Sequence, residues 1–147
     1  AKRFGFHIIH FSIQSDHVHI FAEAKDNTCL GLGMRSLGSC FGKAIRRLVG
    51  GKGSVLLGRY HVHILRTPTE VRNALRYVLL NFSKHSNYIE HVDDYSSGYA
   101  FREWRALIGR KFAAMIADQL SDGRVMRFPE LSQPRSWLAQ EGWKRAA

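Results

Sequence analysis

A β-hairpin near the start of the chain is the feature that most constrains the fold. Residues 6–13 and 17–24 are rich in apolar residues with strand-like alternation, and a short polar stretch between them predicts a tight turn. Side chains alternate between the two faces of a strand, so His17 and His19 share one face with Phe21. The opposite face carries apolar residues that we expect to point toward a core: Val18, Ile20 and Ala22.

The two histidines on one strand face have two interpretations. Neighbouring imidazoles can bind one metal ion, and the alternative is a pair of ordinary histidines on a solvated face. Asp16, directly before the pair, is interpreted as a turn residue. A second His-Val-His motif occurs at His61 and His63, so the choice between the two pairs depends on the rest of the chain.

Apolar residues at helical spacing predict two helices, over about residues 28–49 and 67–83. Glycines in the first helix allow either close packing or the approach of a nucleic-acid backbone: Gly31, Gly33, Gly38 and Gly42. Lys43, Arg46 and Arg47 gather near its end, either as a solvated face or as contacts to phosphates. The second helix begins with a capping box, in which Thr67 caps the helix and Glu70 bonds back to it.

The remaining segments are less regular. Residues 54–66 alternate in polarity and predict a third strand. A loop is expected over 93–99, one or two short helices over 101–119, and an irregular tail broken by Pro129 and Pro134.

The composition favours a polyanionic partner. Lys and Arg total 22 against 12 acids, which gives a net charge of +10. No helix with a basic face opposite a broad apolar face is found, so nucleic acid is favoured over membrane. No apolar run approaches the roughly 20 residues of a membrane span, no secretory leader opens the chain, and two cysteines are too few for a disulfide scaffold. We therefore expect one reducing, cytoplasmic domain.

The second helix carries a polar stripe that suggests phosphoryl chemistry. Asn73, Tyr77 and Asn81 are four residues apart and share one face. A tyrosine phenol, with an ordinary pKa near 10, is a weak nucleophile unless a divalent ion polarises the phosphate that it attacks. His17, His19 and the amide oxygen of Asn81 would supply ligands for that ion. The alternatives are a core tyrosine and a solvated asparagine.

An ordered set of motifs runs along nearly the whole chain: residues 12–19 (SIQSDHVH), 23–24 (EA), 33–34 (GM), 58–61 (GRYH), 65–68 (LRTP), 70–81 (EVRNALRYVLLN), 84–85 (KH), 94–97 (DYSS), 134–138 (PRSWL) and 142–145 (GWKR). This set resembles the HUH single-tyrosine transposases, and specifically the REP-associated tyrosine transposase group. Each His-x-His is a weak signal alone, but the order of the motifs is specific.

The resemblance implies a site and a reaction. The family's metal-binding histidines match His17 and His19, its nucleophile matches Tyr77, and Asn81 matches the residue one turn later. The metal would be Mg²⁺ or Mn²⁺. Such enzymes cut single-stranded DNA beside a REP-like hairpin, form a 5′-phosphotyrosine, leave a free 3′-OH and need no ATP. His63 has no counterpart in the family, so the resemblance favours the first His-Val-His.

The resemblance also implies a fold. We expect an α+β protein with a ferredoxin- or RRM-like antiparallel sheet and helices on one face. Residues 1–86 would form the nuclease core, and residues 87–147 a helical or irregular extension that packs on the core and contacts DNA. The family's first strand and most of its first helix have no counterpart here, so either the chain is incomplete or another chain or segment fills the gap. A homodimer is left open.

We expect DNA contacts from basic and aromatic residues in both parts: Lys43, Arg46, Arg47, Arg59, Arg72, Arg76, Lys84, Arg135, Trp137, Trp143, Lys144 and Arg145. The two tryptophans either cap the core or stack on bases. Two rivals remain. One is a domesticated protein that binds single-stranded nucleic acid without cutting it, and the other is a zinc hydrolase built on His17 and His19.

Overall fold

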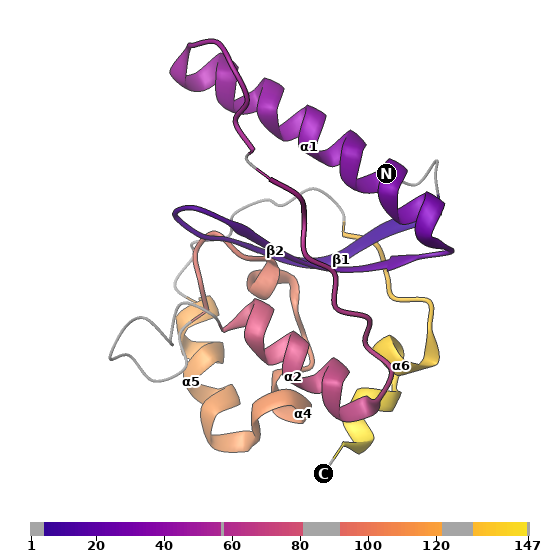
Figure 1. Cartoon of the computed structure of the whole chain (residues 1–147). Coiled ribbons are helices and arrows are strands. Elements are labelled where there is room, and N and C mark those ends of the chain that lie inside the picture. The colour runs from indigo at the N-terminus through magenta and orange to yellow at the C-terminus, as the bar shows by residue number, and fades with distance from the viewer. Residues whose placement is uncertain (1–4, 57, 81–91, 122–130, 147) are drawn as a thin grey trace. The chain divides into compact units, whose positions relative to one another are not determined.

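The computed structural model describes residues 5–56, 58–80, 92–121 and 131–146. In chain order the elements are β1 (Phe6–Ile13), β2 (Val18–Ala24), α1 (Asn27–Val49), α2 (Pro68–Leu79), η2 (Ser97–Ala100), α4 (Trp104–Ile108), α5 (Arg110–Ser121), α6 (Trp137–Gln140) and η3 (Gly142–Arg145) (Figure 1). β1 and β2 pair as a two-stranded antiparallel sheet, which confirms the α+β class and the hairpin. None of the helices in these ranges is long and apolar enough to cross a membrane.

The chain divides into two compact units. The first comprises residues 1–7 and 23–64, and the second comprises residues 8–22 and 65–147. The core of the second unit draws on both predicted parts of the chain, since Leu75 of α2 packs in one cluster with Trp104 and Trp143. The boundary predicted after residue 86 lies outside the described residues.

The first unit is built on α1, which the sequence predicted almost residue for residue. The Asp26 side chain caps the helix by accepting a hydrogen bond from the Cys29 amide at 2.7 Å. Gly50 ends the helix with a positive φ of 69°. A Cβ on Gly33 would lie 2.3 Å from the ring of Phe6, so this glycine permits the close packing that was one of its two interpretations.

The prediction of a strand over residues 54–66 was wrong. In this segment, residue 57 aside, no strand is formed, and the one sheet of the described chain contains only β1 and β2. Alternating apolar residues favour an extended backbone, but a strand also needs a neighbour for its hydrogen bonds. Tyr60 and Leu56 instead lie against Gly31 and Gly38 of α1 and remain about half exposed.

The second unit has the main hydrophobic core. α2 begins as predicted, with Thr67 and Glu70 in a reciprocal capping box. Its buried stripe joins residues of β1, β2, α4, α5 and η3 in one cluster: Ile9, Phe21, Val71, Leu75, Val78, Leu79, Leu80, Val92, Phe101, Trp104, Leu107, Ile108, Ile116 and Trp143. α4 and α5 confirm the two short helices expected over 101–119.

One expectation about β2 was reversed. The apolar residues opposite the histidines were expected to face the core, but they are only partly buried: Val18, Ile20 and Ala22. Phe21, on the histidine face, is 7% exposed and belongs to the core. Alternation fixed which side chains share a face, but it did not show which face the helices cover. As a consequence, the histidine pair lies on the α2 side of the hairpin.

Candidate active site at the hairpin tip

A two-residue turn presents the histidine pair. The backbone amide of Gln14 donates to the carbonyl of His17 at 2.8 Å, which closes the turn at residues 15–16. β2 begins immediately afterwards, at Val18. The first histidine therefore stands at the tip of the hairpin and His19 stands one pleat further along the same face.

The two imidazoles converge on one point. The Nε2 atoms of His17 and His19 are 2.9 Å apart, and the rings meet edge to face with centroids separated by 4.5 Å. Adjacent ligand atoms of an octahedral ion are separated by about 3 Å, because each lies about 2.1 Å from the ion at an angle of about 90°. The two Nε2 atoms are hydrogen-bonded to each other in this structure, and with both nitrogens unprotonated the same separation would suit two neighbouring positions around one divalent ion.

Asp16 has a role that the sequence interpretation missed. Its Oδ1 lies 2.6 Å from Nδ1 of His17. A carboxylate accepts hydrogen bonds, so Nδ1 carries the proton and Nε2 of a neutral His17 presents its lone pair. This hydrogen bond also lowers the pKa of Asp16 below its ordinary value. Carboxylates that orient a metal-binding histidine in this way are common, and the signal in the sequence was an acid directly before the first histidine.

Tyr77 is placed against this pair by α2. Val78 and Leu75 are buried in the core, which leaves Tyr77 on the neighbouring face with 40% of its surface exposed. Its ring meets the ring of His19 edge to face, with centroids 4.6 Å apart. The predicted nucleophile and the predicted metal pair, more than fifty residues apart in the chain, are thus in contact.

The third expected ligand is not described. Asn81 and Lys84 lie outside the described residues, and α2 ends at Leu79 with Leu80 as its cap. Within the ranges that the structure covers, no three His, Cys, Asp or Glu side chains form a metal-binding group. An ion held by the histidine pair would take its other ligands from an amide oxygen, the substrate or water.

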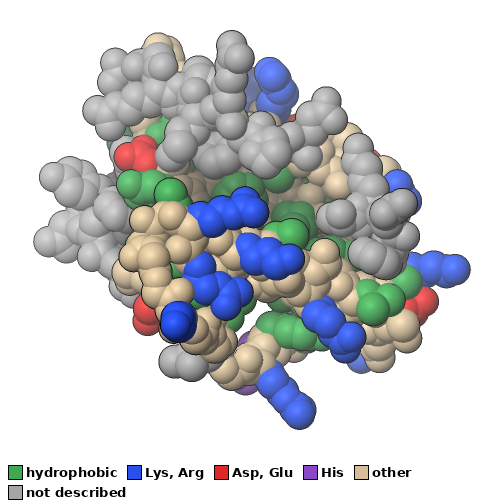
Figure 2. All heavy atoms as spheres, turned by 90° about the horizontal axis from the view of Figure 1, so that it is seen from above, with side chains coloured by type: hydrophobic (Ala, Val, Ile, Leu, Met, Phe, Trp, Pro, Cys, Tyr) green, Lys and Arg blue, Asp and Glu red, His purple; other side chains and the backbone are tan. Residues whose placement is uncertain are grey.

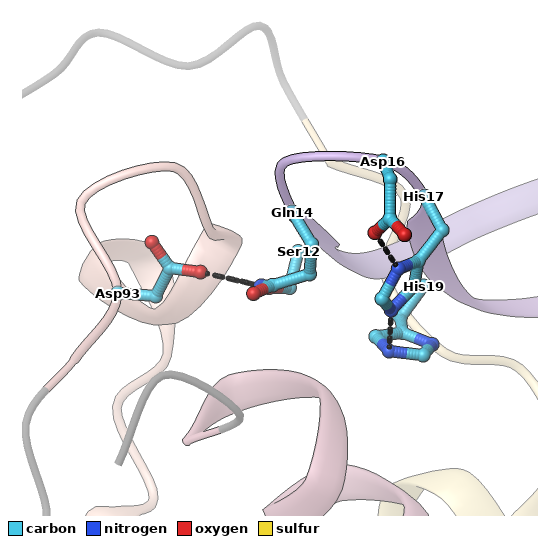
Figure 3. A network of polar contacts seen from close by, with 6 residues as sticks. All are labelled: Ser12, Gln14, Asp16, His17, His19 and Asp93. Atoms are coloured by element: carbon cyan, nitrogen blue, oxygen red, sulfur yellow. Dashed lines mark hydrogen bonds and ion pairs between the residues drawn. The ribbon is translucent and has the colours of Figure 1, made fainter. Parts of the chain in front are cut away.

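A buried polar network lies directly behind the turn (Figure 3). The Asp93 carboxylate, 4% exposed, accepts hydrogen bonds from the Ser12 hydroxyl at 2.9 Å and the Gln14 amide at 2.8 Å. Close by, Nδ1 of His10 lies 3.1 Å from the hydroxyl of Ser97. Burial lowers the pKa of His10 from 6.5 to about 4, so this histidine is neutral at physiological pH.

The second His-Val-His belongs to the other compact unit. His61 and His63 are exposed on the segment that forms no strand. By contrast, His17, His19 and Tyr77 all lie within the second unit. The ring contact with Tyr77 is made by the first pair, and the choice of this pair as the metal site stays a prediction.

The basic residues expected on DNA fall into two groups. In the first unit, residues 28–64 contain no acid and six basic residues: Arg35, Lys43, Arg46, Arg47, Lys52 and Arg59. Among these, Arg46 donates to the carbonyls of Gly42 and Gly53 at the end of α1. Figure 2 shows a face of the molecule on which Lys and Arg side chains gather and few acids appear.

Residues of the second unit vary in how available they are. Arg76 and Arg135 are exposed. Arg72 donates to the carbonyls of Ala146 and Leu107, so its guanidinium holds the C-terminal segment. Lys144 forms ion pairs with two acids. Glu141, at the end of α6, is 3.1 Å away, and Glu103, at the start of α4, is 3.4 Å away.

The two tail tryptophans differ. Trp143 is 2% exposed and packs near Phe101, so it caps the core and has no free face for a base. Trp143 is therefore too buried for the base stacking that was one of its two interpretations. Trp137 is 52% exposed, and the Arg145 guanidinium lies 5.7 Å from its ring centre. Trp137 thus offers the stacking surface that was expected of both.

Comparison of the chain with protein-family models, with curated proteins and with solved structures gave no match.

Proposed function

We propose that this chain is a metal-dependent endonuclease and strand transferase for single-stranded DNA, of the HUH single-tyrosine transposase type. One observation carries the proposal: the ring of Tyr77 contacts His19, whose Nε2 converges with that of His17. A solvated histidine pair would have no need of a tyrosine from another element. Two imidazoles and a phenol within one small exposed site match the parts that this chemistry needs.

Tyr77 is the nucleophile in this proposal. Its phenol oxygen attacks the scissile phosphorus, the bond from phosphorus to the 3′-oxygen breaks, and the DNA 5′-phosphate remains on the tyrosine. The phenol proton passes to solvent, and the departing 3′-oxygen takes a proton from water to become a 3′-OH. The reverse attack by a 3′-OH rejoins DNA and frees the tyrosine, so no ATP is consumed.

His17 and His19 would hold Mg²⁺ or Mn²⁺, with Asn81 as the third protein ligand. When bound there, the ion supplies charge withdrawal from the scissile phosphate. Asp16 keeps the His17 proton on Nδ1 and the ligating nitrogen available. The exposure of Tyr77, His17 and Asp16 leaves room for a phosphate of a DNA strand.

The substrate is single-stranded DNA beside a REP-like hairpin. The net charge of +10 supports a polyanion, and the acid-free stretch over residues 28–64 supports contact with its phosphates. Trp137 with Arg145 supports stacking on an unpaired base.

A covalent-adduct assay tests the proposal. The protein is incubated with a hairpin-bearing single-stranded oligonucleotide and Mn²⁺ or Mg²⁺, then denatured and separated by size. We expect a denaturation-resistant adduct that disappears without metal and in Tyr77→Phe, because phenylalanine keeps the ring and lacks the attacking oxygen. Tyr95→Phe is the matched control, since Tyr95 is also an exposed tyrosine and is not among the residues proposed as nucleophile or metal ligands. An adduct in Tyr77→Phe, or its loss in Tyr95→Phe, contradicts the assignment.

A non-cleaving protein that binds single-stranded nucleic acid is the second candidate. The exposed Trp137 and Arg145 pair favours it, because stacking and phosphate contacts give affinity without chemistry. Salt-dependent binding with no adduct under any metal condition would support this candidate. A zinc hydrolase, in contrast, would keep its activity in Tyr77→Phe, because its nucleophile would be a water molecule.

A further inference from the structure

A carboxylate from far along the chain lies behind the hairpin turn that carries the histidines. Asp93 is almost fully buried and follows β1 by some eighty residues. We propose that Asp93 is a positioning residue that sets the geometry of the His17 and His19 pair. The significance of this role for metal binding rests on the proposed function.

The carboxylate accepts three hydrogen bonds from neutral donors. Oδ2 accepts from the Ser12 hydroxyl at 2.9 Å and from the Gln14 side-chain amide at 2.8 Å, while Oδ1 accepts from the Tyr95 amide at 2.9 Å. Ser12 is itself fully buried. A buried carboxylate is costly unless donors satisfy it, so these donors and Asp93 hold one another in fixed positions.

Gln14 transmits this fixed position to the histidines. Its side-chain amide donates to Asp93 and also to the hydroxyl of Ser12, and its backbone amide closes the turn on the carbonyl of His17. Figure 3 shows Ser12 and Gln14 pointing toward Asp93 on one side of the turn, with Asp16, His17 and His19 on the other. A rotation of the turn would therefore change the direction in which His17 presents Nε2.

The backbone of the Asp93 loop also pairs with β1. The Ile13 amide donates to the carbonyl of Tyr95 at 3.0 Å, and Ser12 forms an isolated antiparallel bridge with Ser96. Because this pairing supports the end of β1 without any side chain of Asp93, removing the carboxylate should disturb the turn more than the fold.

Asp93→Asn tests the role with almost no change in size. One oxygen of the aspartate carboxylate is replaced by an NH₂ group, which meets the Gln14 amide or the Tyr95 amide as a donor facing a donor. Gln119→Ala is the matched control. The Gln119 side chain holds the same loop through both backbone groups of Val92, at 3.1 and 3.0 Å.

Two readouts separate positioning from stability. In the metal-free proteins, long-range nitrogen–proton correlation spectra report the ring environments of His17 and His19. Calorimetric titration with Mn²⁺ then reports the affinity of the pair, under conditions where melting curves show each variant to be folded. We expect Asp93→Asn to shift the His17 and His19 resonances and to weaken Mn²⁺ binding by about tenfold or more. Gln119→Ala should leave the His17 and His19 resonances in place and keep the Mn²⁺ affinity within about twofold of the wild type.

A double variant that exchanges the hydrogen-bond donor and acceptor between positions 14 and 93 should rescue Mn²⁺ binding. Asp93→Asn combined with Gln14→Glu restores a hydrogen bond between the two positions in the opposite direction, and we expect it to recover most of the Mn²⁺ affinity. If Asp93→Asn does not fold, Gln14→Ala provides the same readouts, because it removes the tether and leaves the bonds of Asp93 to Ser12 and Tyr95 in place.

The outcomes are separable from those of the adduct assay. Unchanged histidine resonances in folded Asp93→Asn, or equal changes in Gln119→Ala, overturn the positioning role. Shifted resonances in Asp93→Asn alone support it, and they do so even if the wild-type protein forms no adduct, a result that overturns only the proposed function.

Discussion

A partly buried histidine of β1, His10, makes the stability of the second unit depend on pH. His10 lies between the rings of Phe21 and Phe101, with centroid distances of 6.4 and 5.3 Å. Burial lowers its pKa from 6.5 to about 4. Between pH 6.5 and about pH 4, His10 is therefore protonated in the unfolded chain and neutral in the folded chain. Stability is complete above about pH 6.5 and falls as the pH decreases toward 4.

The size of the effect follows from the two pKa values. A tenfold difference in proton affinity corresponds to about 1.4 kcal/mol, so the full contribution approaches about 3 kcal/mol and about 2.5 kcal/mol is lost by about pH 4.5. Such a loss is a large part of a typical domain's stability. Other carboxylates contribute below their own pKa values, so only the difference between wild type and a variant isolates His10.

Urea denaturation followed by tryptophan fluorescence measures this difference, since all three tryptophans belong to the same unit as His10. We expect the unfolding free energy of the wild type to fall by about 2–3 kcal/mol more than that of His10→Gln between about pH 7.5 and 4.5. Glutamine does not titrate and can still bond to Ser97. Leu107→Ala, a destabilised control, should keep the wild-type slope. Equal slopes in the wild type and His10→Gln would refute the argument.

Two further predictions concern single contacts. Asp16→Asn removes the carboxylate that orients His17, so we expect Mn²⁺ affinity measured by calorimetry to fall about tenfold while the melting temperature stays unchanged; equal affinity would contradict its orienting role. Gly33→Ala places a methyl group 2.3 Å from the ring of Phe6, and we expect urea denaturation to show a loss of about 1–3 kcal/mol. Gly31→Ala, where the nearest side-chain atom is 3.9 Å away, should be neutral or stabilising, and a similar loss in both would count against the packing argument.

Local patterns predicted the elements well because their causes are local. The capping box at Thr67 and the apolar spacing along α1 and α2 act within a few residues, and both helices begin where the sequence indicates. The segment over residues 54–66 shows the limit of such patterns. Its alternation describes the side chains, but a strand exists only when a second backbone accepts its hydrogen bonds.

The candidate site was predicted in part, for a related reason. His17, His19 and Tyr77 follow from motifs, and the structure brings their rings together. Asp93 had no signal of its own, because its partners Ser12 and Gln14 lie some eighty residues away. A buried hydrogen bond between distant segments depends on the whole fold, and no period or spacing in the sequence records it.

The position of the core explains why the histidine pair meets a tyrosine at all. Phe21 shares a strand face with the histidines and is buried against the α2 side of the hairpin. The buried residues of α2 share a core with Phe21, and the exposed Tyr77 of the same helix contacts His19. The same apolar burial that folds the second unit therefore brings the proposed nucleophile and the proposed metal ligands together. Changes that shift α2 on the hairpin, such as truncation of Val78, should for this reason reduce adduct formation more than they reduce DNA binding.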